Sequence, residues 1–533
     1  MPPTAKPTGP FDIVVANGKV VDGTGAPWFR ADVGIVGDRI AAIGDLSTAT
    51  AGRRIDVHGE MVAPGFIDML GQSELNVLID NRVESKIRQG ITTEITGEGI
   101  SAGPTNDVVN AEAKPFLDRF RLKIDWRDLA GYRRRFERDK STINLGTYVG
   151  AASVRAIVLG LGDVKPTADQ LAEMEGVAET AMIEGALGVS SALIYPPGSY
   201  AATEELIALS KVAARYGGIY ATHMRDEADH ETSALDETFR IAREAKIPVE
   251  IFHLKTAGKG NWGKMRDVVA RVERARAEGL DVTADMYPYV AASNNLSANV
   301  PGWAADGGTD KMIARFHDPV QRERIKGELW KSGVAKEAPG DILLASCTNE
   351  SLKRYMGKRL SQAAQQMGRT PEDALLDLVE ADRGSTFVIR FVMSEDDVSL
   401  GLSQPWVSLA CDNPGQAIDG PFANELAHPR AFGSAPRLLG HYARDGRLFS
   451  LEEAVRKMTS LPARRMRLAD RGLVRPGMAA DVTVFDPVRI RDVATYEAPL
   501  RYSEGVDWVI VNGEIVLDQA KLTAARPGRF LTH

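Results

Sequence analysis

The chain has 533 residues, of which 44% are hydrophobic and 26% are charged, a composition typical of a folded protein with more than one core. Its formal net charge of −7 disfavours binding to nucleic acid or anionic lipid. No apolar run reaches the ~20 residues that a membrane helix needs. Cys347 and Cys411 are too few for a disulfide framework, so we expect a reducing, cytoplasmic location. The first residues lack the apolar segment of a signal peptide; a processed secretory protein would begin in the same way, so this start only disfavours export.

Both ends of the chain carry the pattern of a small β-sheet. Within residues 1–62, apolar and polar residues alternate over 11–16 and lead into the hairpin signal Asn17-Gly18. Residues 474–533 repeat the pattern, most clearly at 508–516. Because neither sheet is large enough to be stable alone, we expect the two to pair into one β-sandwich.

Residues 63–473 alternate between apolar strands and amphipathic helices. This order predicts the α/β class and a parallel, TIM-like (β/α)8 barrel. The strands are predicted at 62–68, 91–96, 143–149, 186–191, 217–222, 247–252, 280–285 and 406–411.

The gap between the seventh and eighth predicted strands is long enough to be an insertion, at about 299–400. Helices are predicted within it at 309–332 and 371–381. Two helix starts elsewhere are indicated by capping boxes, Thr167-x-x-Gln170 and Ser450-x-x-Glu453.

Polar side chains with metal chemistry follow four of the predicted strands: Glu98, His223, His253 and Asp412. In a barrel of this kind the active site lies at the C-terminal ends of the strands, so these side chains should meet on one rim. Two imidazoles and a carboxylate suit a catalytic zinc ion, and a further carboxylate can move the proton of its water. Each residue alone has a structural interpretation, as a hydrogen-bonded histidine, a turn glutamate or a loop cap; their combination favours catalysis.

The first predicted barrel strand lacks an expected metal-binding pair. The segment Ala63-Pro64-Gly65-Phe66-Ile67-Asp68 resembles the opening strand of amidohydrolase-superfamily barrels, which normally continues with His-x-His. Here Leu70 and Gln72 stand in the two histidine positions. Leucine cannot bind a metal, and glutamine offers only a neutral amide.

The chain as a whole resembles the N-acyl-D-amino-acid deacylases (D-aminoacylases) of the amidohydrolase superfamily over nearly its full length. The motifs that carry this resemblance are at 63–68, 90–93, 220–225, 282–289, 428–430, 436–442, 453–460, 471–472 and 524–529. Each motif alone is weak, whereas the set is specific for the family.

The resemblance implies one tightly held zinc ion, with Glu98, His223 and His253 as its ligands. Many members use cysteine at the first of these positions, and Glu98 is the substitute here. The family's catalytic aspartate corresponds to Asp412. The absence of His-x-His argues against a two-metal mechanism. Gln72 and Arg225 are expected to support the ligands without binding the metal.

The resemblance also implies how a substrate would be held. A lysine, a tyrosine and a serine bind the substrate carboxylate in the family, and they correspond to Lys255, Tyr287 and Ser293. The arginine that selects acidic side chains in some members is replaced near Asn299, which disfavours N-acyl-D-glutamate and N-acyl-D-aspartate.

These features predict a one-zinc amidohydrolase that cleaves an N-acyl-amino acid, most consistent with the D series. One alternative is a cyclic-amide hydrolase of the dihydroorotase or hydantoinase type, in which a carboxylated Lys255 would bridge two metals. Another is a barrel that has lost catalysis and binds a ligand. In the leading interpretation the partner is a small N-acyl-amino acid rather than a nucleic acid or a membrane, and a homo-oligomer is compatible with the sequence.

Overall fold

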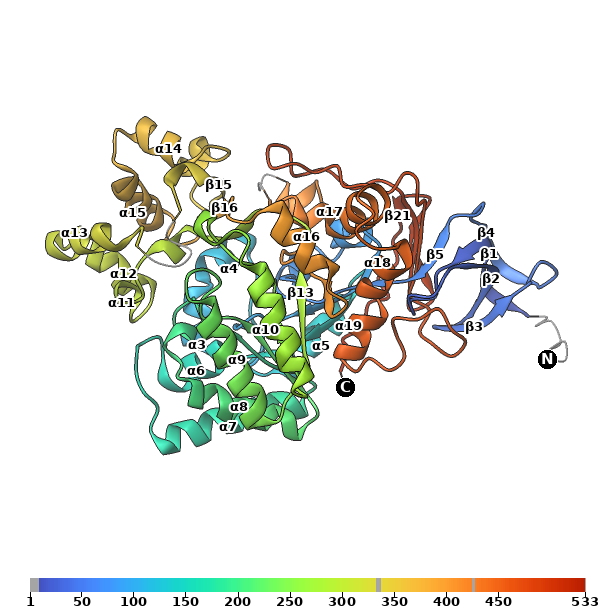
Figure 1. Cartoon of the computed structure of the whole chain (residues 1–533), viewed down its shortest axis with the longest axis horizontal. Helices are drawn as coiled ribbons and strands as arrows, with labels where there is room; N and C mark the ends of the chain where they lie inside the picture. Colours follow the sequence, from blue (N-terminus) through green and yellow to red (C-terminus); the bar gives the residue numbers. More distant parts are fainter. Residues whose placement is uncertain (1–8, 332–336, 424–426, 533) are drawn as a thin grey trace.

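The computed structural model describes residues 9–331, 337–423 and 427–532. A terminal β-domain lies at one end of the molecule, a barrel in the middle and a helical insertion at the other end (Figure 1). No helix in the described ranges is both long and apolar enough to span a membrane.

The two chain ends hydrogen-bond into one nine-stranded sheet. Its strands are β1 (Phe11–Val20), β2 (Phe29–Val36), β3 (Arg39–Gly44), β4 (Ala51–Asp56), β5 (Met61–Pro64), β18 (Val482–Phe485), β19 (Val506–Val511), β20 (Glu514–Asp518) and β21 (Lys521–Leu522). The join is antiparallel, with Val62 opposite Val484. Val33 and Ile510, from opposite chain ends, belong to one buried cluster, so the sheet bends around a shared core.

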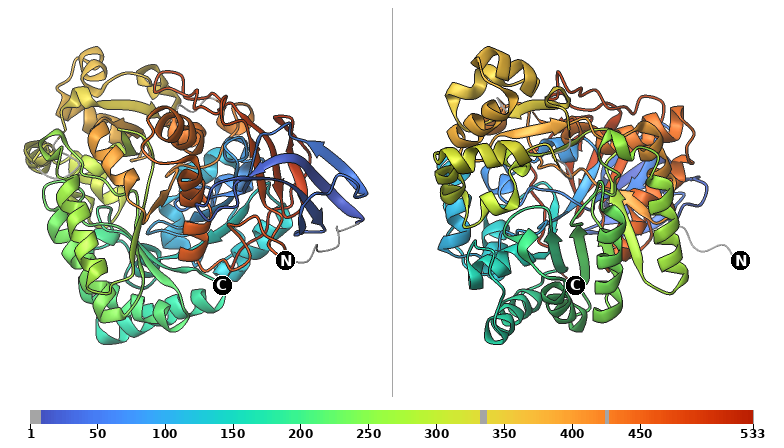
Figure 2. Two further views of the ribbon diagram at one scale, coloured as in Figure 1. Left: turned by 45° about the vertical axis from the view of Figure 1, so that its right-hand side comes forward. Right: turned by 60° about the vertical axis from the view of Figure 1, so that its left-hand side comes forward.

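The central domain is a barrel of parallel strands covered by helices (Figure 2). Its strands are β6 (Phe66–Asp68), β7 (Ile91–Thr96), β8 (Asn144–Thr147), β9 (Val149–Gly150), β10 (Gly188–Ala192), β11 (Ile219–His223), β12 (Val249–Ile251), β13 (Val282–Met286) and β17 (Val407–Leu409). They form two sheets, β6-β7-β8 and β9-β10-β11-β12-β13-β17. Backbone bonds join the sheets at both edges: Met69 N–H donates to Leu409 O at 3.2 Å, and Leu187 N–H to Thr147 O at 2.9 Å.

Helices between these strands pack on the outside of the barrel. The longer ones are α5 (Leu129–Asp139), α6 (Ala151–Leu159), α7 (Ala168–Ile183), α8 (Thr203–Arg215), α9 (Glu231–Ala245), α10 (Met265–Ala277), α16 (Glu395–Ser403), α17 (Arg430–Arg437) and α18 (Leu451–Met458). Shorter ones are α1 (Asn76–Ile79), α2 (Glu84–Ile87), α3 (Asp107–Glu112), α4 (Lys114–Phe120) and α19 (Ser460–Arg465). The capping box at Thr167 and Gln170 is present. The one at Ser450 is only half formed, because Glu453 binds Arg456 instead.

The strand predicted at 62–68 is two strands, because the chain changes sheets at Gly65. Gly65 N–H donates to Asp481 O in the terminal sheet, and Phe66 N–H donates to Gly90 O in the barrel. A side chain at position 65 would meet Thr92 Oγ1 at 2.1 Å, so only glycine allows this close crossing.

The insertion has its own hydrophobic core and an unpredicted antiparallel sheet. The sheet contains β14 (Ala292–Asn295), β15 (Ile342–Ser346) and β16 (Phe387–Arg390). Its helices are α11 (Gly302–Ala305), α12 (Thr309–Phe316), α13 (Pro319–Glu328), α14 (Leu360–Met367) and α15 (Pro371–Ala381). The helix predicted at 309–332 is broken because Pro319 starts a new helix capped by Asp318. The helix predicted at 371–381 is confirmed.

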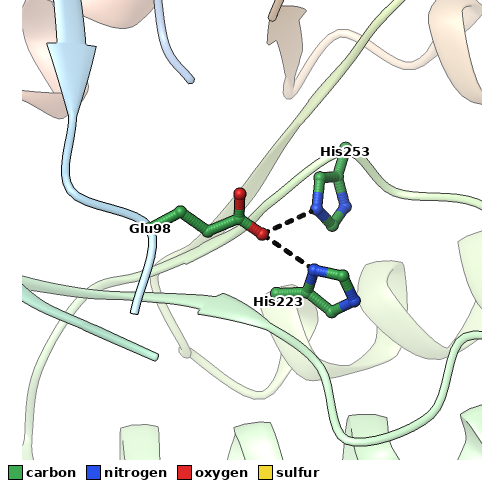
Figure 3. A group of neighbouring side chains, drawn as sticks. All are labelled: Glu98, His223 and His253. Carbon is green, nitrogen blue, oxygen red and sulfur yellow. Dashed lines mark hydrogen bonds and ion pairs between the residues drawn. The ribbon is translucent and has the colours of Figure 1, made fainter. Parts of the chain in front are cut away.

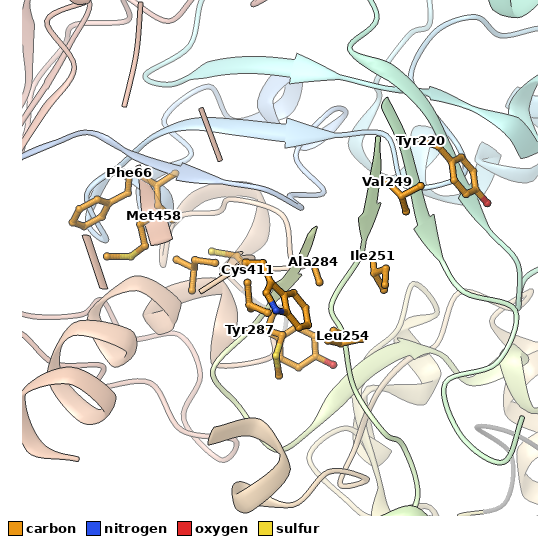
Figure 4. Packing of buried hydrophobic residues seen from close by; sticks show 14 of the residues in the cluster. Phe66, Tyr220, Val249, Ile251, Leu254, Ala284, Tyr287, Cys411 and Met458 are labelled. Carbon is orange, nitrogen blue, oxygen red and sulfur yellow. The ribbon is translucent and has the colours of Figure 1, made fainter. Parts of the chain in front are cut away.

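Apolar side chains from the strands and covering helices fill the space between them, among them Phe66, Ile251, Ala284 and Met458 (Figure 4). One charge is buried beside this core. Lys86 Nζ donates to Asp68 Oδ2 at 2.6 Å and to Asn413 O at 2.8 Å, and it lies 3.8 Å from Glu94. Lys86 therefore ties the end of the first barrel strand to the loop after the last one.

We expect Lys86→Met to lower the free energy of unfolding by about 3–5 kcal/mol, since it leaves buried carboxylates without their cation. Lys114→Met is the matched control, because the Lys114–Asp118 pair is exposed and should contribute little. Thermal and urea unfolding would measure the difference. Equal melting temperatures for the two variants would contradict this role of Lys86.

Candidate metal centre

Glu98 lies on a tight turn at the C-terminal end of β7. Gly97 on one side has a φ of +95°, a conformation that side chains rarely adopt. A Cβ on Gly99 would lie 2.6 Å from that of Ala192. Ser190 of β10 clamps the turn, because its Oγ accepts from Gly99 N–H at 3.0 Å and donates to Gly97 O. The flanking glycines thus serve the turn and aim the glutamate into the barrel mouth.

The two histidines come from the neighbouring strands β11 and β12. His223 is the last residue of β11, and His253 follows β12 with a φ of +34°. This strained backbone is held by Asp285, whose Oδ1 accepts from His253 N–H at 2.7 Å. Strain of this kind is characteristic of functional positions that the surrounding structure fixes.

Glu98, His223 and His253 converge on one point (Figure 3). Glu98 Oε1 lies 2.8 Å from His223 Nδ1 and 3.1 Å from His253 Nε2. One ligand atom from each of the three residues lies within 4.8 Å of the others, and no other such group of three occurs in the described chain. Burial opposes ionisation of Glu98, but hydrogen bonds from both imidazoles hold the pKa of its carboxyl well below the usual value. Two nitrogens and one carboxylate oxygen fit a catalytic zinc site.

A single carboxylate, Glu227, reaches the outer nitrogens of both rings. Its oxygens lie 3.0 Å from His253 Nδ1 and 3.4 Å from His223 Nε2, both as ion-pair contacts, and Lys255 Nζ lies 2.8 Å from the same nitrogen of His253. Burial lowers the pKa of His223, but its contacts with the negatively charged Glu227 and Glu98 outweigh burial and raise that pKa to about 9. Carboxylates in this position orient metal-binding histidines.

Asp412 stands beside the three residues, on the loop after β17. Its φ of +46° is strained, and its N–H donates to Leu70 O at 2.7 Å. Arg430 Nη2 lies 2.8 Å from Asp412 Oδ2. Gln72 donates from Nε2 to Glu98 Oε2 at 2.6 Å and to Asp412 Oδ1 at 3.3 Å. Burial raises the pKa of Asp412 despite the opposing charge of Arg430.

A cavity of about 620 Å³ opens above these groups, between the barrel and the insertion. Several buried donors on its wall have no hydrogen-bond partner among the described residues: Tyr287 Oη, Ser293 Oγ, and Nε and Nη1 of Arg430. The Arg430 guanidinium lies 4.3 Å from the centre of the Tyr287 ring. Lys255 is placed differently, because its Nζ donates to Glu227 Oε1 at 2.7 Å.

The structure brings most of the predicted residues together, and Arg225 and Asn299 are the exceptions. Leu70 is packed in the barrel interior and Gln72 joins the two carboxylates. Arg225 does not contact the group; its guanidinium binds Glu237 at 2.9 Å and the carbonyls of the β10–α8 loop. Asn299 is buried in the insertion, where its Oδ1 accepts from Arg390 at 2.7 Å.

Sequence reasoning missed Glu227 and the contact of Arg430. Glu227 follows His223 by four residues in the motif Thr222-His223-Met224-Arg225-Asp226-Glu227, but it lies in a loop, where spacing predicts no direction. In the sequence, Arg430 is indicated only as part of the family motif at 428–430.

Comparison with known proteins places this chain among relatives of similar length. The amidohydrolase family model matches residues 391–517. A D-aminoacylase of Alcaligenes xylosoxydans xylosoxydans is 37% identical over 528 residues, which is 98% of each chain. An N-acyl-D-glutamate deacylase of the same organism is 36% identical over 524 residues, 98% of this chain and 96% of the relative. A crystal structure of the N-acyl-D-glutamate deacylase from Bordetella bronchiseptica, complexed with zinc and a phosphonate inhibitor, has a TM-score of 0.84 at 32% identity and covers 98% of this chain and 100% of that one.

We expect Glu227→Gln to weaken zinc binding about 10- to 100-fold, since a neutral amide removes the negative charge that contacts both imidazoles. Competition with a chromogenic chelator would measure the affinity of the purified apoprotein. Glu237→Gln is the control, because Glu237 pairs with Arg225 away from the histidines. Unchanged zinc affinity in Glu227→Gln would show that Glu227 does not orient them.

Proposed function

This chain belongs to the D-aminoacylase family of the amidohydrolases, and we propose on that basis that it hydrolyses the amide bond of N-acyl-D-amino acids. The products are a carboxylate and a D-amino acid. One observation carries the proposal: Glu98, His223 and His253 converge beside Asp412 in a cavity whose wall holds unpartnered donors.

The residues at the rim fit one zinc ion per chain. Glu98, His223 and His253 would hold it, with Glu227 orienting the two rings. A bound zinc ion supplies polarisation of the scissile carbonyl and a water of lowered pKa. A second ion lacks support, since Leu70 has no donor atom and the Gln72 amide lies between Glu98 and Asp412.

Asp412 is placed to act as the proton carrier. Its carboxylate accepts a proton from the attacking water and then delivers that proton to the nitrogen of the departing amino acid. A carboxyl with a raised pKa is suited to both steps, because it binds the proton more strongly than an exposed aspartate does. Arg430 and Gln72 fix the direction of this carboxylate.

The unpartnered donors on the cavity wall suit the α-carboxylate of the substrate. Tyr287 and Ser293 offer hydroxyl groups, and Arg430 offers two guanidinium N–H groups. A carboxylate bound there would satisfy groups that are otherwise buried without partners, at a cost of about 1–3 kcal/mol each. Lys255 also lines the cavity, but its charge is paired with Glu227 at 2.7 Å.

The contacts of Lys255 also argue against a cyclic-amide hydrolase with a carboxylated lysine. An ammonium group explains the 2.7 Å contact with Glu227, whereas a carbamate would bring two negative groups together. This contact favours hydrolysis of N-acyl-D-amino acids over hydrolysis of cyclic amides.

We expect zinc-loaded protein to contain one zinc ion per chain and to hydrolyse N-acetyl-D-amino acids but not their L-isomers. Asp412→Asn should lower kcat about 10²- to 10⁴-fold and retain the metal, because it removes only the proton carrier. Metal analysis alongside a substrate panel tests both points. Full activity in Asp412→Asn, or no zinc in active protein, would refute the mechanism.

We expect Ser293→Ala to raise KM about tenfold with little change in kcat, since it removes one hydrogen bond to a charged group in the ground and transition states alike. Ser297→Ala is the matched control: Ser297 also lines the cavity, but its hydroxyl donates to Gly384 O. Steady-state kinetics would distinguish them. Equal KM values for the two variants would remove Ser293 from the carboxylate site.

A further inference from the structure

One acidic side chain on the cavity wall, Glu74, has no part in the reaction described above. Glu74 lines the cavity together with Gln72 and Glu98. Its Oε2 is buried and has no hydrogen-bond partner among the described residues. The backbone around it is fixed, because Glu74 O accepts from Tyr132 Oη at 2.7 Å and the preceding Ser73 binds Glu94.

A buried carboxyl oxygen without a hydrogen-bond partner destabilises the protein unless a ligand supplies that partner. Burial and the charges of Glu94 and Glu98 raise the pKa of Glu74 to about 8. A cation bound beside Glu74 would favour its ionised form, whereas a bound anion would disfavour that form further. The local electrostatics therefore select a positively charged group as the missing partner.

The cationic side chains on the same wall are already paired with other carboxylates. Lys255 lies 2.7 Å from Glu227. Arg430 lies 2.8 Å from Asp412, and the Arg383–Asp310 pair lies at the insertion. Among the described residues of the wall, no cationic side chain is therefore left for Glu74, and a bound molecule can supply its partner.

We propose that Glu74 binds an ammonium or guanidinium group of the substrate, so that the preferred substrates are cationic N-acyl-D-amino acids. This inference rests on the proposed function. The cation could sit on the amino-acid side chain, as in lysine or arginine, or on the acyl group, as in an aminoacyl-D-amino acid. The aliphatic part of such a substrate can contact apolar side chains of the cavity wall: Ile100, Val109, Ala156 and Leu161.

The test compares substrates that differ only in charge. N-acetyl-D-lysine and N-acetyl-D-norleucine form one pair, for the side-chain position; glycyl-D-norleucine and N-acetyl-D-norleucine form the other, for the acyl position. We expect zinc-loaded wild-type protein to favour the cationic member of one pair at least tenfold in kcat/KM. In Glu74→Gln this preference should vanish, with N-acetyl-D-norleucine hydrolysed at its wild-type rate.

Glu74→Asp, which keeps the charge, should retain part of the preference, and melting temperatures would check that both variants fold. Glu112→Gln is the control, because Glu112 lines the cavity but its Oε2 already accepts from Thr309 Oγ1 at 2.7 Å. Calorimetric binding of each pair to Asp412→Asn, with and without Glu74→Gln, gives the same comparison without turnover.

Hydrolysis of N-acetyl-D-norleucine without a cation preference, or a preference that survives in Glu74→Gln, would overturn the role of Glu74 and leave the proposed function standing. Failure to hydrolyse any substrate of the panel would overturn the proposed function, and this inference with it.

Discussion

The position of both candidate histidine ligands depends on one buried carboxylate. Glu227 reaches His223 from one oxygen and His253 from the other, and it also neutralises Lys255. An imidazole that binds a metal through one nitrogen is oriented by the groups that contact the other, which are Glu227 at His223 and both Glu227 and Lys255 at His253. One residue therefore contacts both rings. Asp285 adds to this by holding the strained backbone of His253.

Leu70 and Gln72, which stand in place of the histidine pair after the first barrel strand, both have other contacts. Leu70 extends the apolar packing inside the barrel, and Gln72 donates to two carboxylates that would otherwise repel each other. The strand end itself remains anchored by the Asp68–Lys86 pair, which also reaches the loop that carries Asp412. Glu98, His223 and His253 therefore converge without the histidine pair, in keeping with a one-zinc enzyme.

Among the described residues, the cavity wall holds buried polar atoms without hydrogen-bond partners, and their positions indicate which polar groups a bound molecule would carry. Donors gather at Tyr287, Ser293 and Arg430, and an acceptor without a partner lies at Glu74. Groups of opposite character at separate places favour a substrate with a carboxylate and a cation. The insertion contacts the barrel beside this cavity, since Thr309 of α12 donates to Glu112 of α3.

The sequence by itself determined the pairing of the two chain ends, the parallel strands of the barrel and the polar residues at their ends, because the strand pattern and the rule for active-site placement are both local or topological. It also indicated the family through its motifs. Only the tertiary structure decided which side chains meet. Glu227 and Arg225 both follow His223 in one loop, yet only Glu227 turns towards the ring, because backbone direction in loops depends on distant contacts. The strand β14 escaped prediction for a related reason: Ala292-Ser293-Asn294-Asn295 has little intrinsic strand preference, and it is a strand because β16 lies beside it.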